Sequence, residues 1–308
     1  MINKPSIFIS NTFDPYTNLA TEEYFLEKVD EGQIVLYLWR NERTVVVGRN
    51  QNIFAEVNLD ALKAMDGNPT RRLSGGGAVY HDDGNLNFTF VCRSGDFDVD
   101  RQTTVVLDAV RNLGFDAEKT GRNDLCIGGR KFSGHSYFRA SDRCFHNGTI
   151  LIRTDAAAMA SVLNVSATKL ASKGVKSVRS RTVNLSEIDA STSLESVVAS
   201  FKACFAKEYG SPEELVEPYA DPLHALLRGK FISDEWIFNR KLSWNSRWEG
   251  RSPEGNVSVL MDVRNGVIAD CAVYSDALDP GYSADVRNAL LGKPYKKVNF
   301  EEIVTRRV

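Results

Sequence analysis

A short segment at residues 121–134, GRNDLCIGGRKFSG, carries a lysine and an aspartate that could act together on a phosphate. Gly128-Gly129 is typical of a two-residue hairpin loop. This loop predicts that Cys126 opposes Lys131 and Asp124 opposes Ser133, so that one face of the hairpin carries all four side chains. An ammonium group can meet a phosphate and a carboxylate can hold magnesium, so this face suits a nucleotide site. Taken alone, the hairpin is also compatible with a surface lysine paired with a carboxylate.

The same loop fixes the other face of the hairpin. It predicts that Ile127 opposes Arg130 and that Leu125 opposes Phe132. Leu125, Ile127 and Phe132 then form an apolar set that can pack on a core. We therefore expect the lysine and the aspartate to be held on a rigid strand pair.

A second candidate is RRLSGGGAVYHDDGN at residues 71–85, with three consecutive glycines. Such a run is normally explained by positive φ values or by close approach of the backbone to another group, and its bare amides can donate to anions. In an extended segment, Arg72 and Ser74 lie on one side and Arg71 on the other. The alternative is a glycine-rich turn with a solvated arginine pair.

A third, weaker candidate is HNGTILI at residues 146–152. Gly148 allows a close approach of the backbone, and Thr149 offers a hydroxyl at the start of a strand.

The composition is typical of an ordinary soluble globular protein. It has 308 residues, 43% of them hydrophobic and 25% charged, which excludes a disordered tail or a fibre. The 38 basic and 40 acidic residues give a net charge of −2, without the cationic surplus typical of nucleic-acid or membrane-surface binding. No apolar run is long enough to cross a bilayer, and no signal peptide is evident at the start, so a cytoplasmic location is expected.

The cysteines do not form a recognisable framework. Their number, 5, is odd, and no CxxC or metal-ligand spacing is present, so we expect reduced, buried thiols.

Hydrophobic periodicity predicts the elements that position these segments. Helices are expected at 19–29 with Asn18 as the N-cap, and at 59–65, 103–113, 156–164, 194–210 and 283–292. Strands are expected at 34–39 and 44–48, joined by a turn, and at 86–92 and 145–152, with Leu86, Phe88, Phe90 and Cys92 on one side of their strand.

The last sixty or so residues have a different character. Asn265-Gly266 joins two β-rich runs, 257–263 and 267–275, and predicts a hairpin. We place a domain boundary near 240–247, which gives domains of residues 1–242 and 247–308.

Taken together and in this order, RRLSGGGAVYHDDGN, GRND followed by GRKFSG, and DRCFHNGTILI resemble the lipoate-protein ligases of the lipoyl and biotin ligase superfamily. The similarity extends to ISNTFDPYTNLATEE, LWRNERTVVVGRNQN, KGVKSVRSRTVNL at 173–185 and the hairpin ending VYSDALDP. The resemblance implies an α/β (α+β) fold. A large mixed-sheet catalytic domain would be followed by a small α+β accessory domain that moves as a lid.

The resemblance also implies roles for individual residues. Lys131 would be the catalytic lysine that contacts the substrate carboxylate and the α-phosphate, and Asp124 would hold magnesium. The implied ATP and adenylate site comprises Arg72, Gly75, Gly76, Gly77, Ala78, Val79, Tyr80, Asn123, Asp124 and Lys131. The implied lipoate site comprises Arg72, Ser74, Lys131, Ser133, Gly134, His146, Gly148 and Thr149.

Three features depart from the family pattern. Gly128-Gly129 is a shorter turn than in some relatives, His135 stands where a small residue is common, and Asn147 stands where a second histidine is frequent. These departures bear on the shape of the pocket more than on its chemistry.

The implied reaction uses ATP with Mg²⁺, and lipoic acid as substrate. Lipoate is activated as lipoyl-AMP and then transferred to a lysine of lipoyl-acceptor domains, those of 2-oxoacid dehydrogenase complexes or the glycine cleavage H protein. A monomer with no nucleic-acid or membrane partner is expected. The alternatives are a transferase that accepts preformed lipoyl-AMP, an octanoyltransferase that forms a thioester on Cys126 or Cys144, and an inactive module that binds acylated domains.

Overall fold

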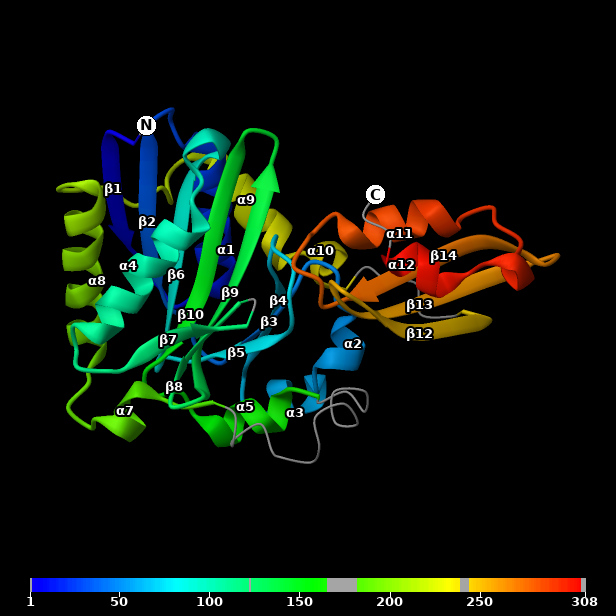
Figure 1. Ribbon diagram of the computed structural model, residues 1–308, viewed down its shortest axis with the longest axis horizontal. Helices are drawn as coiled ribbons and strands as arrows, with labels where there is room; N and C mark the ends of the chain where they lie inside the picture. The colour runs from blue at the N-terminus through cyan, green and yellow to red at the C-terminus, as the bar shows by residue number, and fades with distance from the viewer. Residues whose placement is uncertain (1, 122, 165–181, 239–243, 306–308) are drawn as a thin grey trace.

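The computed structural model describes residues 2–121, 123–164, 182–238 and 244–305. A large part built on a mixed sheet lies beside a smaller part formed by the last sixty residues (Figure 1). The predicted α/β class, with a small second α+β unit, is confirmed.

One eight-stranded sheet organises the large part. Its first three strands are parallel, and the others pair antiparallel. In spatial order the strands are β11 (Glu213–Glu214), β1 (Lys4–Ile9), β2 (Gln33–Trp39), β6 (Asn85–Arg93), β10 (Arg143–Leu151), β9 (Arg130–Ala140), β8 (Asp124–Ile127) and β7 (Ala117–Thr120).

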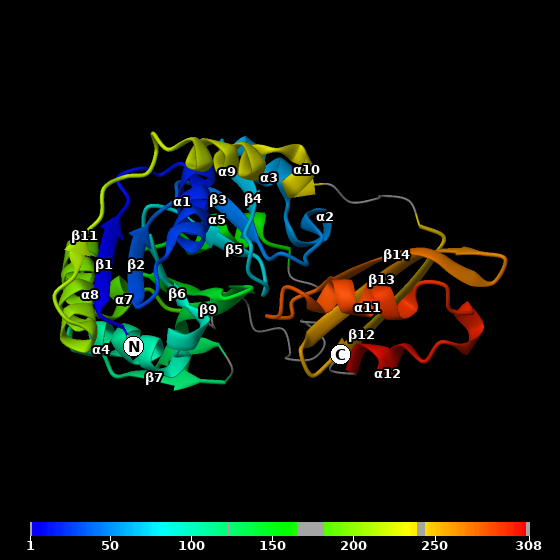
Figure 2. The same cartoon turned by 90° about the horizontal axis from the view of Figure 1, so that it is seen from above.

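Helices cover both faces of this sheet (Figure 2). α4 (Val99–Arg111) and α8 (Leu194–Tyr209) pack on one face, and α1 (Pro15–Lys28) and α9 (Pro222–Ile232) on the other. The predicted alternation in β6 is confirmed: Leu86, Phe88, Phe90 and Cys92 enter the first core, whereas Val91 enters the second. The short elements η1 (Ser94–Asp96) and α7 (Leu185–Ile188) lie in the connections of this part.

A second, three-stranded sheet stands at one end of the large part. It comprises β4 (Asn68–Arg71), β3 (Thr44–Val47) and β5 (Val79–His81), flanked by α2 (Ile53–Glu56), α3 (Leu59–Ala64), α5 (Ala156–Val162) and α10 (Asp234–Phe238). β2 and β3, predicted as strands joined by a turn, therefore belong to different sheets.

The small part has a core of its own. Its antiparallel sheet contains β12 (Ser246–Ser252), β13 (Gly255–Arg264) and β14 (Val267–Ser275), and it is covered by α11 (Tyr282–Leu290), η3 (Tyr295–Lys297) and α12 (Phe300–Thr305). Asn265 and Gly266 have φ values of 50° and 77°, so the predicted hairpin turn is confirmed. The predicted domain boundary overlaps residues 239–243, which lie outside the described residues.

Two helix starts differ from the prediction by several residues. α1 begins at Pro15, because the Asp14 side chain accepts hydrogen bonds from the amides of Tyr16 and Thr17 and proline favours the first helical position. Asn18 is instead buried inside the helix and donates to the Arg40 carbonyl at 2.7 Å. α4 begins at Val99, four residues early, because Asp98 caps it. None of the described helices has the length and apolarity needed to span a bilayer.

Candidate active site

A cavity of about 270 Å³ opens where the three-stranded sheet β4-β3-β5 meets β9 and β10 of the eight-stranded sheet. Its lining includes five apolar side chains from the two sheets and the helices beside them, namely Leu19, Trp39, Val46, Leu151 and Met159. Polar groups line the remaining wall, among them Arg72, Asn123, Lys131 and Asn147. An apolar chamber with convergent polar groups is the usual form of a small-molecule site.

The glycine loop after β4 forms one wall. The Arg72 guanidinium, 8% exposed, donates to the Gly75 carbonyl at 2.6 Å, to the Gly77 carbonyl at 2.9 Å and to the Val46 carbonyl at 3.2 Å. Its Nε also donates to Ser74 Oγ at 3.1 Å, so the predicted shared side of Arg72 and Ser74 is confirmed. Burial lowers the pKa of Arg72 to about 10, which leaves the cation fully charged at neutral pH.

Arg71 points away from the loop, as predicted, but it is not solvated. Its side chain is fully buried and donates to the carbonyls of Gly48, Gln51 and Ile237. Arg71 therefore fixes the backbone behind the loop.

The small part of the chain touches the glycine loop directly. The Gly76 amide donates to the Ala277 carbonyl at 2.8 Å, and a Cβ on Gly75 would lie 2.3 Å from that same oxygen. A Cβ on Gly77, by contrast, would meet nothing within 4 Å, and Gly77 lines the cavity. In this conformation the Gly76 amide is occupied, and Gly77 is the glycine of the loop that is open toward a ligand.

The strands that the Gly128-Gly129 hairpin joins contribute another part of the wall, including Lys131 and Gly134. The two glycines have φ values of 55° and 73°, and Ile127 and Cys126 pair with Arg130 and Lys131 as predicted. The predicted pairings Leu125–Phe132 and Asp124–Ser133 are wrong, because a bulge makes Leu125 oppose Ser133 and Asp124 oppose Gly134.

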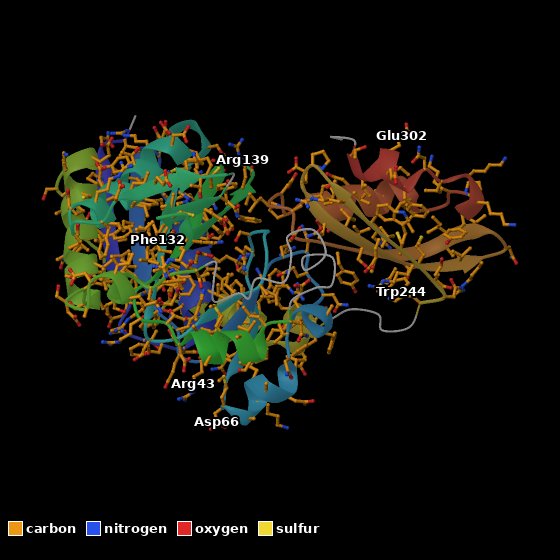
Figure 3. The ribbon with its side chains drawn as sticks, turned by 60° about the horizontal axis from the view of Figure 1, so that its bottom comes forward. Arg43, Asp66, Phe132, Arg139, Trp244 and Glu302 are labelled. Carbon is orange, nitrogen blue, oxygen red and sulfur yellow. The ribbon has the colours of Figure 1, made fainter. Side chains whose placement is uncertain are left out.

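A long-range pairing lies next to the bulge. The Lys131 carbonyl accepts a hydrogen bond of 2.9 Å from the Val183 amide, and Lys131 forms a parallel bridge with Thr182. Phe132 still reaches the core: it is fully buried in the large part of the molecule, where Figure 3 labels it. The hairpin is therefore anchored although its register shifts.

Lys131 and Asp124 share a face, as predicted. Lys131 Nζ lies 2.7 Å from Asp124 Oδ1, and the two side chains are 37% and 41% exposed. The lysine lies across Gly134, where a Cβ would come within 2.7 Å of its Nζ. Gly134 is thus required for this position of the ammonium.

A histidine pair lies between the sheet and α4, with His135 in the cavity wall and His146 behind it. His146 Nδ1 is 3.1 Å from Gln102 Oε1, so it carries the proton, and His146 Nε2 accepts from His135 Nδ1 at 2.8 Å. His135 Nε2 then accepts from Ser133 Oγ at 3.1 Å. Burial lowers the pKa of His146 to about 3 and that of His135 well below its ordinary value, so both rings are neutral at pH 7.

The structure divides the predicted site residues into two groups. Those that line the cavity are Arg72, Gly76, Gly77, Ala78, Val79, Tyr80, Asn123, Lys131, Gly134, Gly148 and Thr149. Those that stand behind or beside its wall are Ser74, Gly75, Asp124, Ser133 and His146. Ser74, Ser133 and His146 are at most 1% exposed and contact other wall side chains.

Sequence reasoning missed several lining residues. Leu19 and Trp39 come from segments that share the family resemblance but were assigned no site residue, and Asn85 and Asn87 alternate with the apolar residues of β6. Thr182 belongs to the segment 173–185, of which residues 173–181 lie outside the described part of the chain. The polar positions in an otherwise buried strand were the available signal for Asn85 and Asn87.

The five cysteines are free and buried, as expected. Cys126 and Cys144 do not line the cavity; their Sγ atoms contact Thr120 Oγ1 at 2.9 Å and Ser94 Oγ at 3.1 Å. Neither thiol is placed to attack a substrate held there.

Comparison with known proteins identifies the class. Residues 14–206 match the family model of the lipoyl protein ligase A/B catalytic domain, and residues 243–306 match that of the bacterial lipoate protein ligase C-terminus. The chain therefore belongs to the lipoate-protein ligase family and is an enzyme of that family.

Individual relatives agree in sequence and in fold. The chain is 35% identical over 304 residues to lipoate-protein ligase A of Bdellovibrio bacteriovorus, covering 96% of this chain and 90% of the relative. The crystal structure of P. falciparum LipL1 in complex with lipoate matches with a TM-score of 0.81 and 26% identity, over 96% of this chain and 95% of that one. A bipartite lipoate protein ligase with its E2 lipoyl domain from Thermoplasma acidophilum matches 78% of this chain and 98% of that one, with a TM-score of 0.68 and 27% identity.

Proposed function

We propose that this enzyme activates lipoate with ATP as lipoyl-AMP and then transfers the lipoyl group to a lysine of a lipoyl domain. The observation that carries the proposal is the cavity, whose partly apolar wall is shared by a lysine on the hairpin strand and by the glycine loop. Three similar structures support the same ligands. One contains lipoate, another includes a lipoyl domain, and a lipoate-protein ligase A with 25% identity and a TM-score of 0.65 contains ATP.

In the first step, a lipoate carboxylate oxygen attacks the α-phosphorus of ATP and pyrophosphate leaves. The enzyme needs no nucleophile of its own for this step. It needs positive charge and N–H donors where negative charge develops. Lys131 supplies the ammonium, Arg72 supplies a fixed cation, and the Gly77 backbone can approach the phosphate without a side chain in the way.

Magnesium would enter with ATP. No cluster of three or more His, Cys, Asp or Glu that could hold a metal was found among the described residues, which fits an ion held largely by phosphates and one carboxylate. Asp124, 41% exposed beside Lys131, is the carboxylate we assign to it. The ion would neutralise charge on the phosphates.

In the second step, the ε-amine of the acceptor lysine attacks the carbonyl carbon of lipoyl-AMP, and AMP leaves with the electron pair of the broken C–O bond. The proposed acceptors are lipoyl domains of 2-oxoacid dehydrogenase complexes or the glycine cleavage H protein. Ser74, Ser133 and His146 support the wall of the lipoate site from behind, whereas Gly148 and Thr149 face the substrate.

The test is mass spectrometry of a purified apo lipoyl domain incubated with the enzyme, lipoate, Mg²⁺ and ATP, together with a pyrophosphate assay. We expect a gain of one lipoyl group that requires ATP. A gain with added lipoyl-AMP but none with ATP would contradict the adenylation step and leave a transferase. A reaction that octanoyl thioester supports and ATP does not would establish the thioester alternative.

A further inference from the structure

A buried glutamate lies behind the cavity on α1. Glu22 is fully buried between the helix and the large sheet. Its Oε1 accepts hydrogen bonds from Thr89 Oγ1 at 2.7 Å and from Asn147 Nδ2 at 2.9 Å. Its Oε2 is also buried and has no partner among the described residues. A buried carboxylate with an unpaired oxygen costs stability, so its presence calls for a compensating role.

The hydrogen bonds around Glu22 run in one direction. Ser136 Oγ donates its single hydrogen to Asn147 Oδ1 at 2.6 Å, so Ser74 Oγ, at 2.8 Å, must donate to Ser136. Arg72 Nε in turn donates to Ser74 Oγ at 3.1 Å. These hydrogen bonds therefore form a hydrogen-bond chain that begins at the Arg72 guanidinium and ends at the Glu22 carboxylate.

Three members of this hydrogen-bond chain line the cavity, although Glu22 does not. Arg72, Ser136 and Asn147 all contribute to the wall. A second branch reaches the wall as well, because the Trp39 indole N–H donates to Thr89 Oγ1 at 3.2 Å and Trp39 lines the cavity. The orientation of both polar and aromatic wall groups is thus tied to one carboxylate.

We propose that Glu22 is a positioning residue of the lipoate site, whose carboxylate orients Asn147 and, through Ser136 and Ser74, helps to fix the Arg72 guanidinium in the cavity wall. This inference rests on the proposed function, because it takes lipoate as the occupant of the cavity. Glu22 touches no substrate; it acts through residues that do.

Few charged groups face Glu22. Arg72 attracts it, Glu23 repels it weakly, and Tyr37 of β2 lies near it; β6 and β10 present the uncharged Thr89 and Asn147. On α9, Lys230 is paired with Glu23 at 2.7 Å. Burial raises the pKa of Glu22 to about 7, against the opposing effect of Asn147, Thr89 and Arg72. The carboxylate is therefore ionised at pH 8 and largely protonated at pH 6.

Glu22→Gln tests the role with little change of shape. If its carbonyl oxygen takes the place of Oε1, a buried amide group replaces Oε2 where no acceptor is available. If the amide turns the other way, its N–H group faces the N–H group of Asn147, and the hydrogen bonds of the hydrogen-bond chain would have to reverse their direction. Either way, the negative charge that attracts Arg72 is lost. Glu23→Gln is the matched control, because it removes a carboxylate from the same helix at a site paired with Lys230.

The experiment is calorimetric titration of lipoate into the wild type, Glu22→Gln and Glu23→Gln at pH 8 and pH 6. We expect Glu22→Gln to weaken lipoate binding at least tenfold at pH 8 and less than threefold at pH 6, where the wild-type carboxyl is itself mostly protonated. Glu23→Gln should stay within twofold of the wild type at both pH values. Ser136→Ala, which cuts the chain and leaves the Glu22 contacts in place, should weaken binding several-fold at pH 8 and serves if Glu22→Gln does not fold.

An equal loss at both pH values would reveal a merely structural role and overturn the proposal. So would unchanged lipoate binding in Glu22→Gln or in Ser136→Ala. A wild type that binds lipoate but releases no pyrophosphate with ATP would contradict the proposed function and leave this test intact, whereas a wild type that binds no lipoate would contradict both.

Discussion

Replacing Lys131 with alanine should separate catalysis from stability. The lysine side chain is 37% exposed and the Asp124 side chain with which it forms an ion pair is 41% exposed, so the loss of folding stability should be at most about 1 kcal/mol. The ammonium nevertheless lines the cavity in which we propose that lipoate and ATP react. Removing one preorganised donor from such a site costs about a hundredfold to a thousandfold in rate, or about 2.7–4 kcal/mol.

Lys131→Arg should not restore full activity. A planar guanidinium fork cannot take the place of a compact ammonium between two closely spaced anions. Lys202→Ala is the matched control, since Lys202 is 40% exposed and has an ion pair of 2.8 Å to Glu214, and it does not line the cavity.

The assay is ATP-dependent pyrophosphate release in single turnover, with lipoyl transfer measured by mass spectrometry. Near wild-type rates in Lys131→Ala, together with loss of transfer in Cys126→Ser or Cys144→Ser, would refute the adenylation mechanism. Comparable losses in Lys202→Ala and Lys131→Ala would show that the effect comes from folding.

Four further outcomes are expected. Gly134→Ala should reduce pyrophosphate release at least tenfold with little change in melting temperature, because its Cβ would displace the Lys131 ammonium; an unchanged rate would show that this position of the lysine is not needed. Shortening octanoate by two methylenes should weaken calorimetric binding on the order of tenfold, at about 0.8 kcal/mol for each methylene, whereas a preference for lipoate over octanoate above roughly a thousandfold would imply specific recognition of the dithiolane. A variant that ends near residue 245 and remains folded should still bind or form some lipoyl-AMP, and complete loss of both would show that the small part supplies direct ligands. The free energy of unfolding in urea should fall as the pH drops below 6.5. Each of the neutral buried histidines His81, His135 and His146 should lower it by about 1.4 kcal/mol per pH unit, whereas Glu22 should raise it by one such contribution, because its raised pKa favours the folded state on acidification. A rise in stability at pH 5.5 would contradict these assignments.

Local chemistry in the sequence was enough to predict the turns and the alternating strand. Gly128-Gly129 and Asn265-Gly266 both adopt positive φ values that other residues rarely tolerate, so their sequence identifies the hairpins directly. The strand at 86–92 alternates between two cores because both faces of the large sheet are covered by helices. These features depend on a few neighbouring residues.

Features that depend on distant partners could not be predicted in this way. The bulge at Phe132 lies next to Lys131, which also pairs with Thr182 and Val183, some fifty positions away. The cap at Asp14 competes with Asn18, and the choice depends on the buried partners of Asn18 at Arg40 and Asn41. Each of these outcomes requires knowledge of which segments meet.

Glu22 did leave a signal in the sequence. It lies three residues after Leu19 and three before Phe25, on the apolar face of the predicted first helix. A carboxylate at such a position must be buried or must break the amphipathic pattern. Its partners, however, come from β6 and β10, and no spacing along the chain indicates them.

The triple glycine shows how one motif can serve two surfaces. Gly75 lacks a side chain because Ala277 and Leu278 of the small part occupy that space, with carbonyl oxygens 2.3 and 2.5 Å from a Cβ placed there. Gly76 adopts a φ of 90° and gives its amide to Ala277. Gly77 alone of the three faces the cavity with open space around it. Close backbone approach was therefore the correct physical reason for the run, but two of the three approaches are to the other part of the same chain. A substitution at Gly75 should consequently disturb the contact between the two parts before it disturbs the ligand site.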